Sequence, residues 1–455
     1  MLKKIVFPLL LLVSVAVASI FLTPYLRQLS LTLGITKVQI SIAGTGSMYP
    51  TFPKGAGATD IIKAQEIVAW PQMQTYPGGI NLFGFDLFSY KLSHGDIVEI
   101  ENGKTKQLSL DKYKEEAGFV KRVVALPGDT ISLRDGFVSL NGKVLDEPYT
   151  AKPRSTYGGE FLPDCKTLTI PKNSVFVMGD NRKASLDSRF ELGLVNTSDI
   201  HFVLPWSKQA EYKKSFRDAK NDLSYAHTTT LDPEEFVRLL NDKRQGKKLP
   251  AYKYNPLLSA SSKRRGYVMI ATDDFSTEAS RSGVTLAKAV KEAGYQNVIF
   301  AEVFTRGFYE ADELLDNFAE FPETQKILYS AECQDIGLSP VLGEIGSCPV
   351  QVVVVHFGGY VPPNYSKGEL DSWQKLISNI EEVLPSWRVL KGVEGIDQNK
   401  LNQLLEALET RLSHAKEINA QMQKNLWLTD AEKKWVEDDK KLGMEAERII
   451  GELKK

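Results

Sequence analysis

The chain has 455 residues, of which 42% are hydrophobic and 25% are charged, and this composition excludes a disordered protein, a collagen-like protein and a disulfide-built miniprotein. Lys and Arg number 56 against 57 Asp and Glu, so the net charge of -1 gives no reason to expect a nucleic-acid partner. Three cysteines allow at most one disulfide bond, and with five histidines they leave too few ligands for several zinc modules.

An apolar segment opens the chain. Lys3 and Lys4 precede an uncharged run of 22 residues, from Ile5 to Leu26, which as a helix can cross the roughly 30 Å hydrocarbon core of a bilayer. We therefore expect residues 1–27 to form a transmembrane anchor. The two lysines favour an N-terminus in the cytoplasm and the rest of the chain outside. A cleavable signal peptide, ending at the small residues 16–18, is the alternative.

Short β-type runs separated by turn residues fill residues 38–207. This pattern predicts a domain made mostly of antiparallel sheet. Pro127-Gly128-Asp129 and Asn141-Gly142 are typical turns within it. The clearest predicted strands are 96–100, 120–126, 130–133, 137–140 and 174–178.

A polar and charged segment, residues 208–230, has little to bury and is predicted to be a linker. Asp232 then provides an N-cap, with Pro233 at the first helical position and Glu235 closing a capping box. From here to residue 363 helical and strand patterns mix, so we expect a second, α/β domain. Its helices are predicted at 236–243, 286–293 and 310–318, and its strands at 298–303 and 350–357.

Amphipathic helices are predicted over residues 366–455. Ser366 opens a capping box, and apolar residues follow at helical spacing until Pro385. Two further helices, the second capped at Thr429, carry apolar stripes and are joined by a short turn, which predicts an antiparallel hairpin. We expect the hairpin to pack against the helix that carries Trp373; a coiled coil with a partner is the alternative.

Four motifs in the β-type domain occur in a fixed order. Together they resemble the sequence boxes of type I signal peptidase, and the resemblance covers roughly residues 1–207. The motifs are Gly44-Thr45-Gly46-Ser47-Met48-Tyr49-Pro50-Thr51, His94-Gly95-Asp96-Ile97-Val98, Lys121-Arg122-Val123-Val124-Ala125-Leu126-Pro127-Gly128-Asp129, and Gly179-Asp180-Asn181-Arg182-Lys183-Ala184-Ser185-Leu186-Asp187-Ser188-Arg189.

Ser47 and Lys121 carry the expected chemistry. A serine hydroxyl needs a base, and a lysine can be that base only when its pKa, ordinarily about 10.4, is lowered by burial. Lys121 lies in an apolar run that suits this requirement, although its local sequence alone favours an ordinary lysine at a strand edge. Ser47, beside Gly46, reads equally well as an exposed nucleophile or as a turn serine.

The resemblance decides these readings and assigns roles. It implies that Ser47 is the nucleophile, Lys121 the general base, and the Ser47 N–H with the Thr45 hydroxyl the oxyanion hole. Ser185 matches a hydroxyl that positions the lysine, and Asp187 with Arg189 matches a supporting ion pair. The implied reaction is acyl transfer without a metal or organic cofactor. The implied substrates are membrane-bound preproteins, cut after a small residue that has another small residue two positions before it.

An apolar and aromatic run, Leu82 to Phe88, follows the first motif. It reads either as a segment that dips into the lipid interface or as a buried strand.

Residues 231–363 weakly resemble the CAP superfamily of cysteine-rich secretory and pathogenesis-related proteins. The cues include Tyr254-Asn255-Pro256-Leu257-Leu258, Ala293-Gly294-Tyr295 and Ala301-Glu302. Family members line a cleft with two histidines and two acidic residues, but only Glu302 matches clearly and His356 is the one histidine here. We therefore expect no metal site. We interpret the domain as a binding or scaffolding module that, with the hairpin, offers a surface to a protein partner.

The cysteines leave two readings open. Cys333 and Cys348 flank a Gly- and Pro-containing segment and would face an oxidising exterior. Either they form a disulfide bond, with Cys165 unpaired, or they are buried free thiols.

The sequence as a whole therefore predicts a multidomain protein: an N-terminal transmembrane helix, a mainly β Ser/Lys peptidase domain, an α/β CAP-like domain and a helical hairpin. We expect it in the cell membrane, with its domains outside the cytoplasm. Two alternatives remain. One is a Ser/Lys protease dedicated to particular surface proteins, and the other is a catalytically inert binding or scaffold protein.

Overall fold

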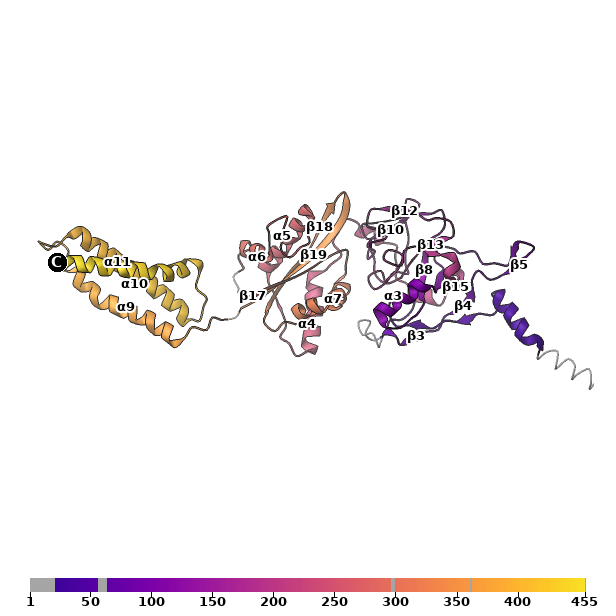
Figure 1. Ribbon diagram of the computed structural model, residues 1–455, viewed down its shortest axis with the longest axis horizontal. Coiled ribbons are helices and arrows are strands. Elements are labelled where there is room, and N and C mark those ends of the chain that lie inside the picture. Colours follow the sequence, from indigo (N-terminus) through magenta and orange to yellow (C-terminus); the bar gives the residue numbers. More distant parts are fainter. Residues whose placement is uncertain (1–20, 56–63, 296–298, 361, 455) are drawn as a thin grey trace, which may run out of the picture. The chain divides into compact units, whose positions relative to one another are not determined.

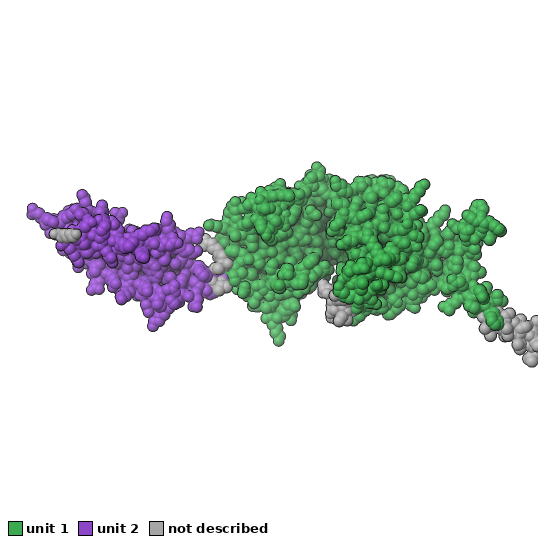
Figure 2. Space-filling model, viewed as in Figure 1, with its two compact units in different colours: residues 1–359 green, residues 360–455 purple. Residues whose placement is uncertain are grey.

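The structure is a computed structural model that describes residues 21–55, 64–295, 299–360 and 362–454. The chain divides into two compact units, with the boundary between Gly359 and Tyr360 (Figure 2). The first unit contains a β region, residues 38–204, and an α/β region, residues 233–359 (Figure 1). The second unit is helical.

The expected anchor falls mainly on residues that lie outside the described part of the chain. Residues 21–32, at its end, are helical, and Phe21, Leu22, Tyr25 and Leu26 are exposed there. Among the described residues, no helix has the length and apolar character that a bilayer crossing requires.

The β region is built on an antiparallel sheet of seven strands. The strands predicted from alternation are present, within a residue or two of the expected bounds. In spatial order, the seven strands of the sheet are β1 (Val38–Gln39), β4 (Gln72–Thr75), β15 (Ile200–Leu204), β7 (Ile97–Ile100), β8 (Phe119–Ala125), β13 (Ser174–Met178) and β14 (Val195–Asn196).

Among its described residues, the β region also contains three smaller antiparallel sheets. One has four strands, in the order β11 (Lys143–Val144), β10 (Phe137–Leu140), β9 (Thr130–Arg134) and β12 (Thr167–Thr169). The other two are pairs: β2 (Ile42–Ala43) with β3 (Ile67–Ala69), and β5 (Ile80–Leu82) with β6 (Phe85–Leu87).

Strands β8 and β13 separate two parts of the hydrophobic core. Because side chains alternate across a strand, Val123 and Val177 enter one core cluster while Val124 and Phe176 enter another. Both strands are therefore buried on both faces. Functional side chains on β8 are held by packing from above and below.

The hairpin of β5 and β6 is exposed, so the buried-strand reading of this segment is wrong. Phe83 is 92% exposed, and Phe85 and Phe88 are also exposed. Within the described chain the two short strands pair only with each other, and every residue of both strands is exposed.

Helix α3 (Gly103–Tyr113) was not expected from the sequence. It is held by a reciprocal capping box between Asn102 and Thr105, and only Thr105 and Ser109 are buried. A helix with so little apolar surface leaves no periodic pattern to detect.

The predicted linker is an ordered part of the β region. Three short 3-10 helices follow β15, and two polar side chains hold them in place. Gln209 donates to Leu204 O and Gly95 O. Arg217 donates to the main-chain oxygens of Thr150 and Glu147. A polar segment can pack when its partners are main-chain oxygens, which the composition does not reveal. The helices are η2 (Trp206–Lys208), η3 (Tyr212–Ser215) and η4 (Asp222–Tyr225).

The α/β region has three layers. A four-stranded sheet lies between helix α5 (Pro256–Thr272) on one face and helices α4 (Pro233–Gly246) and α7 (Ala311–Ala319) on the other (Figure 1). Helix α8 (Pro322–Leu328) packs into the same core cluster as α4 and α7. The sheet's longest strand alternates accordingly, because Val353 and Val355 contact the α4 side while Val352 and Val354 contact α5. The strands are β16 (Lys253–Tyr254), β18 (Asp335–Ile345), β19 (Cys348–Gly359) and β17 (Ile299–Arg306).

The helices of this region begin where their caps indicate. Asp232 accepts hydrogen bonds from Glu234 N and Glu235 N, with Pro233 at the first position, as expected. Helix α5, which was not predicted, is capped by Asn255. The helices are α4 (Pro233–Gly246), α5 (Pro256–Thr272), α6 (Leu286–Glu292), α7 (Ala311–Ala319) and α8 (Pro322–Leu328).

The second unit has three helices, so the predicted hairpin is one part of a larger bundle: α9 (Lys367–Arg388), α10 (Gln398–Gln423) and α11 (Asp430–Leu453). The expected capping boxes at Ser366 and Thr429 are formed. Pro385 does not end α9, which continues to Arg388. Helix α10 supplies most of the buried apolar residues of this unit and packs against both α9 and α11. The packing of the hairpin against α9, which carries Trp373, was expected.

The disulfide bond joins Cys165 to Cys348, so the reading that pairs Cys333 with Cys348 is wrong. Of the two buried free thiols in the other reading, only Cys333 is one. Cys348 begins β19 at an end that lies against the β region, where Arg134 also donates to Ser347 O at 3.0 Å. Cys333 instead packs in the core of the α/β region. The bond therefore ties the two regions of the first unit together.

We predict that a non-reducing digest of the oxidised protein yields a peptide pair linked through Cys165 and Cys348. Cys333→Ser, the control, should leave this link intact, whereas Cys348→Ser should leave Cys165 open to alkylation and lower the free energy of unfolding by about 3–5 kcal/mol. Mass spectrometry and urea unfolding provide the measurements. A link between Cys333 and Cys348 would contradict the structure.

Candidate active site

Ser47 lies in the loop that follows β2. Gly46, with a φ of +75°, turns the chain just before it, in a conformation that glycine adopts readily. Buried Met48 and Phe52 anchor the loop in the core, and the Ser47 main-chain oxygen accepts a hydrogen bond of 3.1 Å from Asn181 N. The half-buried Ser47 side chain is thereby fixed at the surface of the core.

Lys121 faces Ser47 from strand β8. Its Nζ lies 3.1 Å from Ser47 Oγ and donates to Val120 O at 3.0 Å. The residue is only 4% exposed and sits within the sheet, because β8 pairs with β7 on one side and β13 on the other. The strand-edge reading of this lysine is therefore wrong.

The environment of Lys121 favours its neutral form. Burial lowers the pKa of the amine to about 8, because the charged form loses its hydration, and the nearby carboxylate of Asp187 only partly opposes this shift. A neutral amine at hydrogen-bond distance from a hydroxyl can take its proton.

Thr45 lies beside the Ser47 main chain. The Ser47 N–H donates to Thr45 Oγ1 at 3.4 Å, and the same hydroxyl lies 3.4 Å from Ser47 Oγ. Bonds of this length are weak, so an incoming oxyanion can replace them at little cost. Both groups that the resemblance assigned to the oxyanion hole thus lie beside the Ser47 hydroxyl.

Ser185 lies close to the site without the expected contact. Its Oγ is buried and, within the described chain, has no hydrogen-bond partner, so it does not hold the Lys121 amine here. The hydroxyl fits only because residue 179 is glycine: a Cβ there would lie 2.2 Å from Ser185 Oγ and 2.4 Å from Ser47 O. Gly179 therefore lets the Ser185 segment and the Ser47 loop approach each other.

Asp187 and Arg189 form the expected ion pair. Both side chains are fully buried, and two parallel bonds of 2.9 Å join Nε to Oδ1 and Nη2 to Oδ2. Burial by itself raises the pKa of the Asp187 carboxyl, but the Arg189 charge and the hydrogen bonds from Arg189 and Gly179 N outweigh it and hold that pKa below its usual value.

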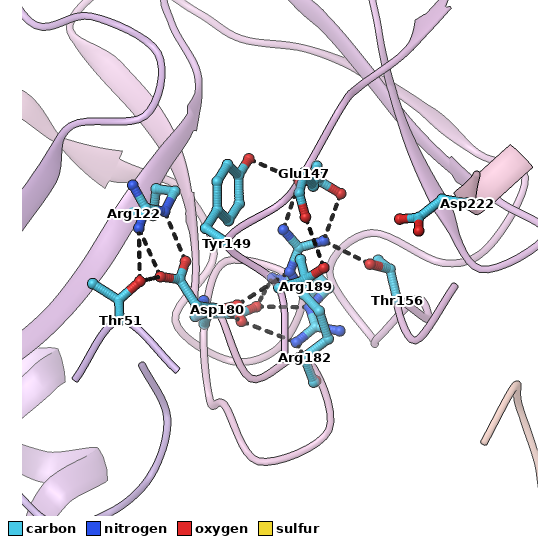
Figure 3. A network of polar contacts seen from close by, with 12 residues as sticks. Thr51, Arg122, Glu147, Tyr149, Thr156, Asp180, Arg182, Arg189 and Asp222 are labelled. Carbon is cyan, nitrogen blue, oxygen red and sulfur yellow. Dashed lines mark hydrogen bonds and ion pairs between the residues drawn. The ribbon is translucent and has the colours of Figure 1, made fainter. Parts of the chain in front are cut away.

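A second buried ion pair, between Arg122 and Asp180, was missed from the sequence. The Arg122 guanidinium bonds to Asp180 through Nε and Nη2, both at 2.7 Å, and also contacts Thr51, Gln209 Oε1 and Gly95 O (Figure 3). Arg122 follows Lys121, so alternation along β8 sends the two side chains to opposite faces. The sequence feature that could have revealed this ion pair is an arginine inside an otherwise apolar strand.

The Arg122 pair belongs to a larger network of three buried arginines. Arg182 bonds to Glu147 at 2.6 Å and to Thr156, and Arg189 donates to the main-chain oxygen of Arg182 at 2.7 Å (Figure 3). The network therefore fixes the segment 179–189, which supplies Asp187 and Ser185 to the site.

A small apolar pocket of about 240 Å³ opens beside Ser47 and Lys121. Its apolar lining suits uncharged side chains. The apolar residues that line it include Ile42, Ala43, Met48, Phe52, Ile67, Phe119, Val120 and Leu186.

In the α/β region, His356 is packed between protein groups. Its Nε2 lies 2.9 Å from Glu302 Oε2 and its Nδ1 lies 2.7 Å from Ser261 Oγ, while Arg265 pairs with the same carboxylate. Burial lowers the pKa of the His356 imidazole. Because both ring nitrogens are engaged and the histidine is fully buried, this cluster suits packing better than ligand binding.

Among the described residues, Glu99, Glu101 and His201 are the group of side chains close enough together to share a cation. Glu101 is already paired with Lys106 at 2.6 Å. Glu99 lies opposite Val120 in the sheet and Val98 lies opposite Lys121, so alternation directs Glu99 away from the Lys121 face. These residues take no part in the Ser47 site.

A family model described as signal peptidase, peptidase S26, matches residues 12–203. Signal peptidase I of Bacillus licheniformis is 34% identical over 131 residues, which are 28% of this chain and 65% of that protein. Signal peptidase I S of Bacillus subtilis is 41% identical over 90 residues, 19% of this chain and 49% of that protein. This chain thus spans about half to two thirds of these relatives. The matches support a signal peptidase function.

Two solved structures show weaker likeness. A signal peptidase I from Enterococcus faecalis is 28% identical, with 25% of this chain and 97% of that chain covered and a TM-score of 0.20. A cysteine-rich secretory protein from Staphylococcus aureus is 11% identical, with 71% of this chain and 99% of that chain covered and a TM-score of 0.22. TM-scores this low do not establish a common fold.

We predict that Arg122→Met lowers the free energy of unfolding by about 3–5 kcal/mol, because the Asp180 carboxylate stays buried without its charge partner. Arg238→Met is the matched control: Arg238 pairs with Glu235 and Asp242 on the exposed face of α4, and its loss should change little. Urea unfolding followed by tryptophan fluorescence measures both. Equal midpoints for the two variants would contradict a supporting role for the buried network.

Proposed function

We propose that the protein is a membrane-bound serine endopeptidase of the signal peptidase I type. One observation carries the proposal: a buried lysine amine with a lowered pKa lies 3.1 Å from the hydroxyl of a serine in a glycine-turned loop. The family match over residues 12–203 supports the same activity.

The proposed reaction is acyl transfer. Neutral Lys121 takes the Ser47 proton as Oγ attacks the scissile carbonyl carbon. The developing oxyanion is bound by the Ser47 N–H and the Thr45 hydroxyl. The protonated Lys121 then gives its proton to the leaving amine, which departs as the new N-terminus. Water, deprotonated by the Lys121 amine, then hydrolyses the acyl-enzyme and restores Ser47. This chemistry calls for no metal or cofactor.

The proposed substrates are exported preproteins with small residues before the cut. The apolar pocket beside Ser47 supports the uncharged character of these residues, since a charged side chain would lose its hydration there.

The proposed location is the outer face of the cell membrane. Two features support it: the apolar run of the first 26 residues, with lysines at its start, and the exposed aromatic side chains of the β5–β6 hairpin. Phe83, Phe85 and Phe88 would enter the lipid interface and bring Ser47 to a membrane-bound substrate.

A dedicated processing protease is the second candidate. It is favoured by the α/β region, which is joined to the β region by a disulfide bond and lines a cavity next to the Ser47 loop. An inert scaffold is disfavoured, because a scaffold gains nothing from the energetic cost of a buried lysine.

We predict that Ser47→Ala and Lys121→Met each reduce the cleavage of a membrane-inserted preprotein by a factor on the order of a thousand or more. Lys106→Met, which removes an exposed lysine paired with Glu101, should leave the rate unchanged. Gel analysis of precursor and mature product measures the three variants. Wild-type rates in all of them would overturn the enzyme proposal, and cleavage of one native substrate among many would favour the dedicated protease.

We also predict that kcat/KM rises with pH between about pH 6 and pH 10, with a midpoint near pH 8. The sign follows from the lowered pKa: below it Lys121 is charged and cannot accept a proton, and above it the amine is neutral. His94→Gln is the control: it changes an exposed histidine that contacts Asp129 rather than Ser47 or Lys121, and it should keep the same rise. A flat profile for the wild type would contradict the assignment of Lys121 as base.

A further inference from the structure

A second cavity, of about 510 Å³, adjoins the pocket beside Ser47. The two share Thr45, Gly46 and Ala184, so a chain that passes the nucleophile can run from one into the other. The second cavity has a different lining, because several charged side chains replace the apolar residues of the first.

One wall of this cavity comes from the α/β region. Helix α7 turns Leu314, Leu315 and Phe318 into its own core, and this leaves its polar side chains on the other face. Asp312 and Asp316, four residues apart on that face, line the cavity.

The opposite wall comes from the β region and reaches the nucleophile loop. Lys54, seven residues after Ser47, has its Nζ 4.0 Å from Asp316 Oδ2. Its side chain lies close to Gly46, because a Cβ on that glycine would be 3.1 Å from Lys54 Cβ. Asp316 is 59% exposed and also pairs with Lys243 at 3.0 Å. Its carboxylate therefore lies across the cavity from the loop that carries Ser47.

The wall is held in place by several contacts. Lys152 of the β region pairs with Glu310 at 2.7 Å and with Asp312 at 2.9 Å. Lys183, from the segment that carries Ser185, is half-buried, and its buried Nζ lies 3.8 Å from the centre of the Tyr309 ring. These contacts hold the start of α7 against the β region, and the disulfide bond between Cys165 and Cys348 joins the same two regions covalently.

An extended substrate has two arms around the scissile bond. If the apolar pocket receives the small side chains before the cut, the arm after the cut is directed to the second cavity. This step depends on the proposed function. We propose that helix α7 is a specificity-determining wall for the residues that follow the scissile bond, and that Asp316 reads their charge.

The test uses the full chain in a Ser47→Ala background, where bound peptide cannot be cleaved by the proposed reaction. The probes are fluorescent peptides with the same small residues before the cut and either an acidic or a basic segment after it. Fluorescence anisotropy gives the two dissociation constants for each protein. Asp316→Lys is compared with Glu323→Lys, which makes the same charge change at an exposed position on α8 outside the cavity. Thermal melting checks that both variants fold.

We expect Asp316→Lys to shift the ratio of the two dissociation constants toward the acidic peptide by about threefold to tenfold at low salt, and less at high salt. Glu323→Lys should keep the ratio of the Ser47→Ala protein. A peptide that ends with the residue before the scissile bond, and so has no segment after it, should bind both variants with the same dissociation constant. Equal ratios in the two variants, or binding of neither peptide, would overturn the role of α7.

The same variants with Ser47 intact separate this inference from the proposed function. A shift in the kcat/KM ratio that matches the binding shift supports both. A binding shift without any cleavage supports the wall and overturns the peptidase activity. Cleavage with an unchanged ratio overturns the wall and leaves the activity standing.

Discussion

The structure of the site depends on the burial of one amine beside one hydroxyl. Lowering the pKa of Lys121 from 10.5 to about 8 corresponds to about 3 kcal/mol, a large share of the stability of an ordinary domain. A fold keeps such a group only when its surroundings are rigid enough to exclude water from it. Central placement in the seven-stranded sheet, with β7 and β13 on either side, provides that rigidity for Lys121.

Strand β8 serves both the site and its support. Alternation places Lys121 toward Ser47 and the next residue, Arg122, on the other face, where it pairs with buried Asp180. Asp180 belongs to the same segment as Asp187 and Ser185, and Asn181 of that segment holds the Ser47 main chain. Ser47, Lys121 and the two buried ion pairs thus meet through one strand and one loop, so a shift in either would move them all.

The α/β region bears on the same site from outside the β region. Its attachment is covalent at Cys348 and ionic at Glu310, and its helix α7 completes a cavity that the β region alone would leave open. The pocket beside Ser47 is small and apolar, whereas this second cavity is larger and charged. Under the proposed function, the two sides of the scissile bond meet different linings, one mainly apolar and the other charged.

The sequence by itself determined the features that depend on near neighbours. Alternating residues predicted β8, β9, β10 and β13, local caps predicted the starts of α4, α9 and α11, and ordered motifs singled out Ser47 and Lys121. Tertiary structure decided what depends on residues far apart in the chain: the partner of Cys348, the pairing of Arg122 with Asp180, the packing of residues 208–230, and the exposure of Phe83. The reason is physical. Caps and alternation act within a few residues, but burial, a shifted pKa or a disulfide partner is set by segments that only the folded chain brings together.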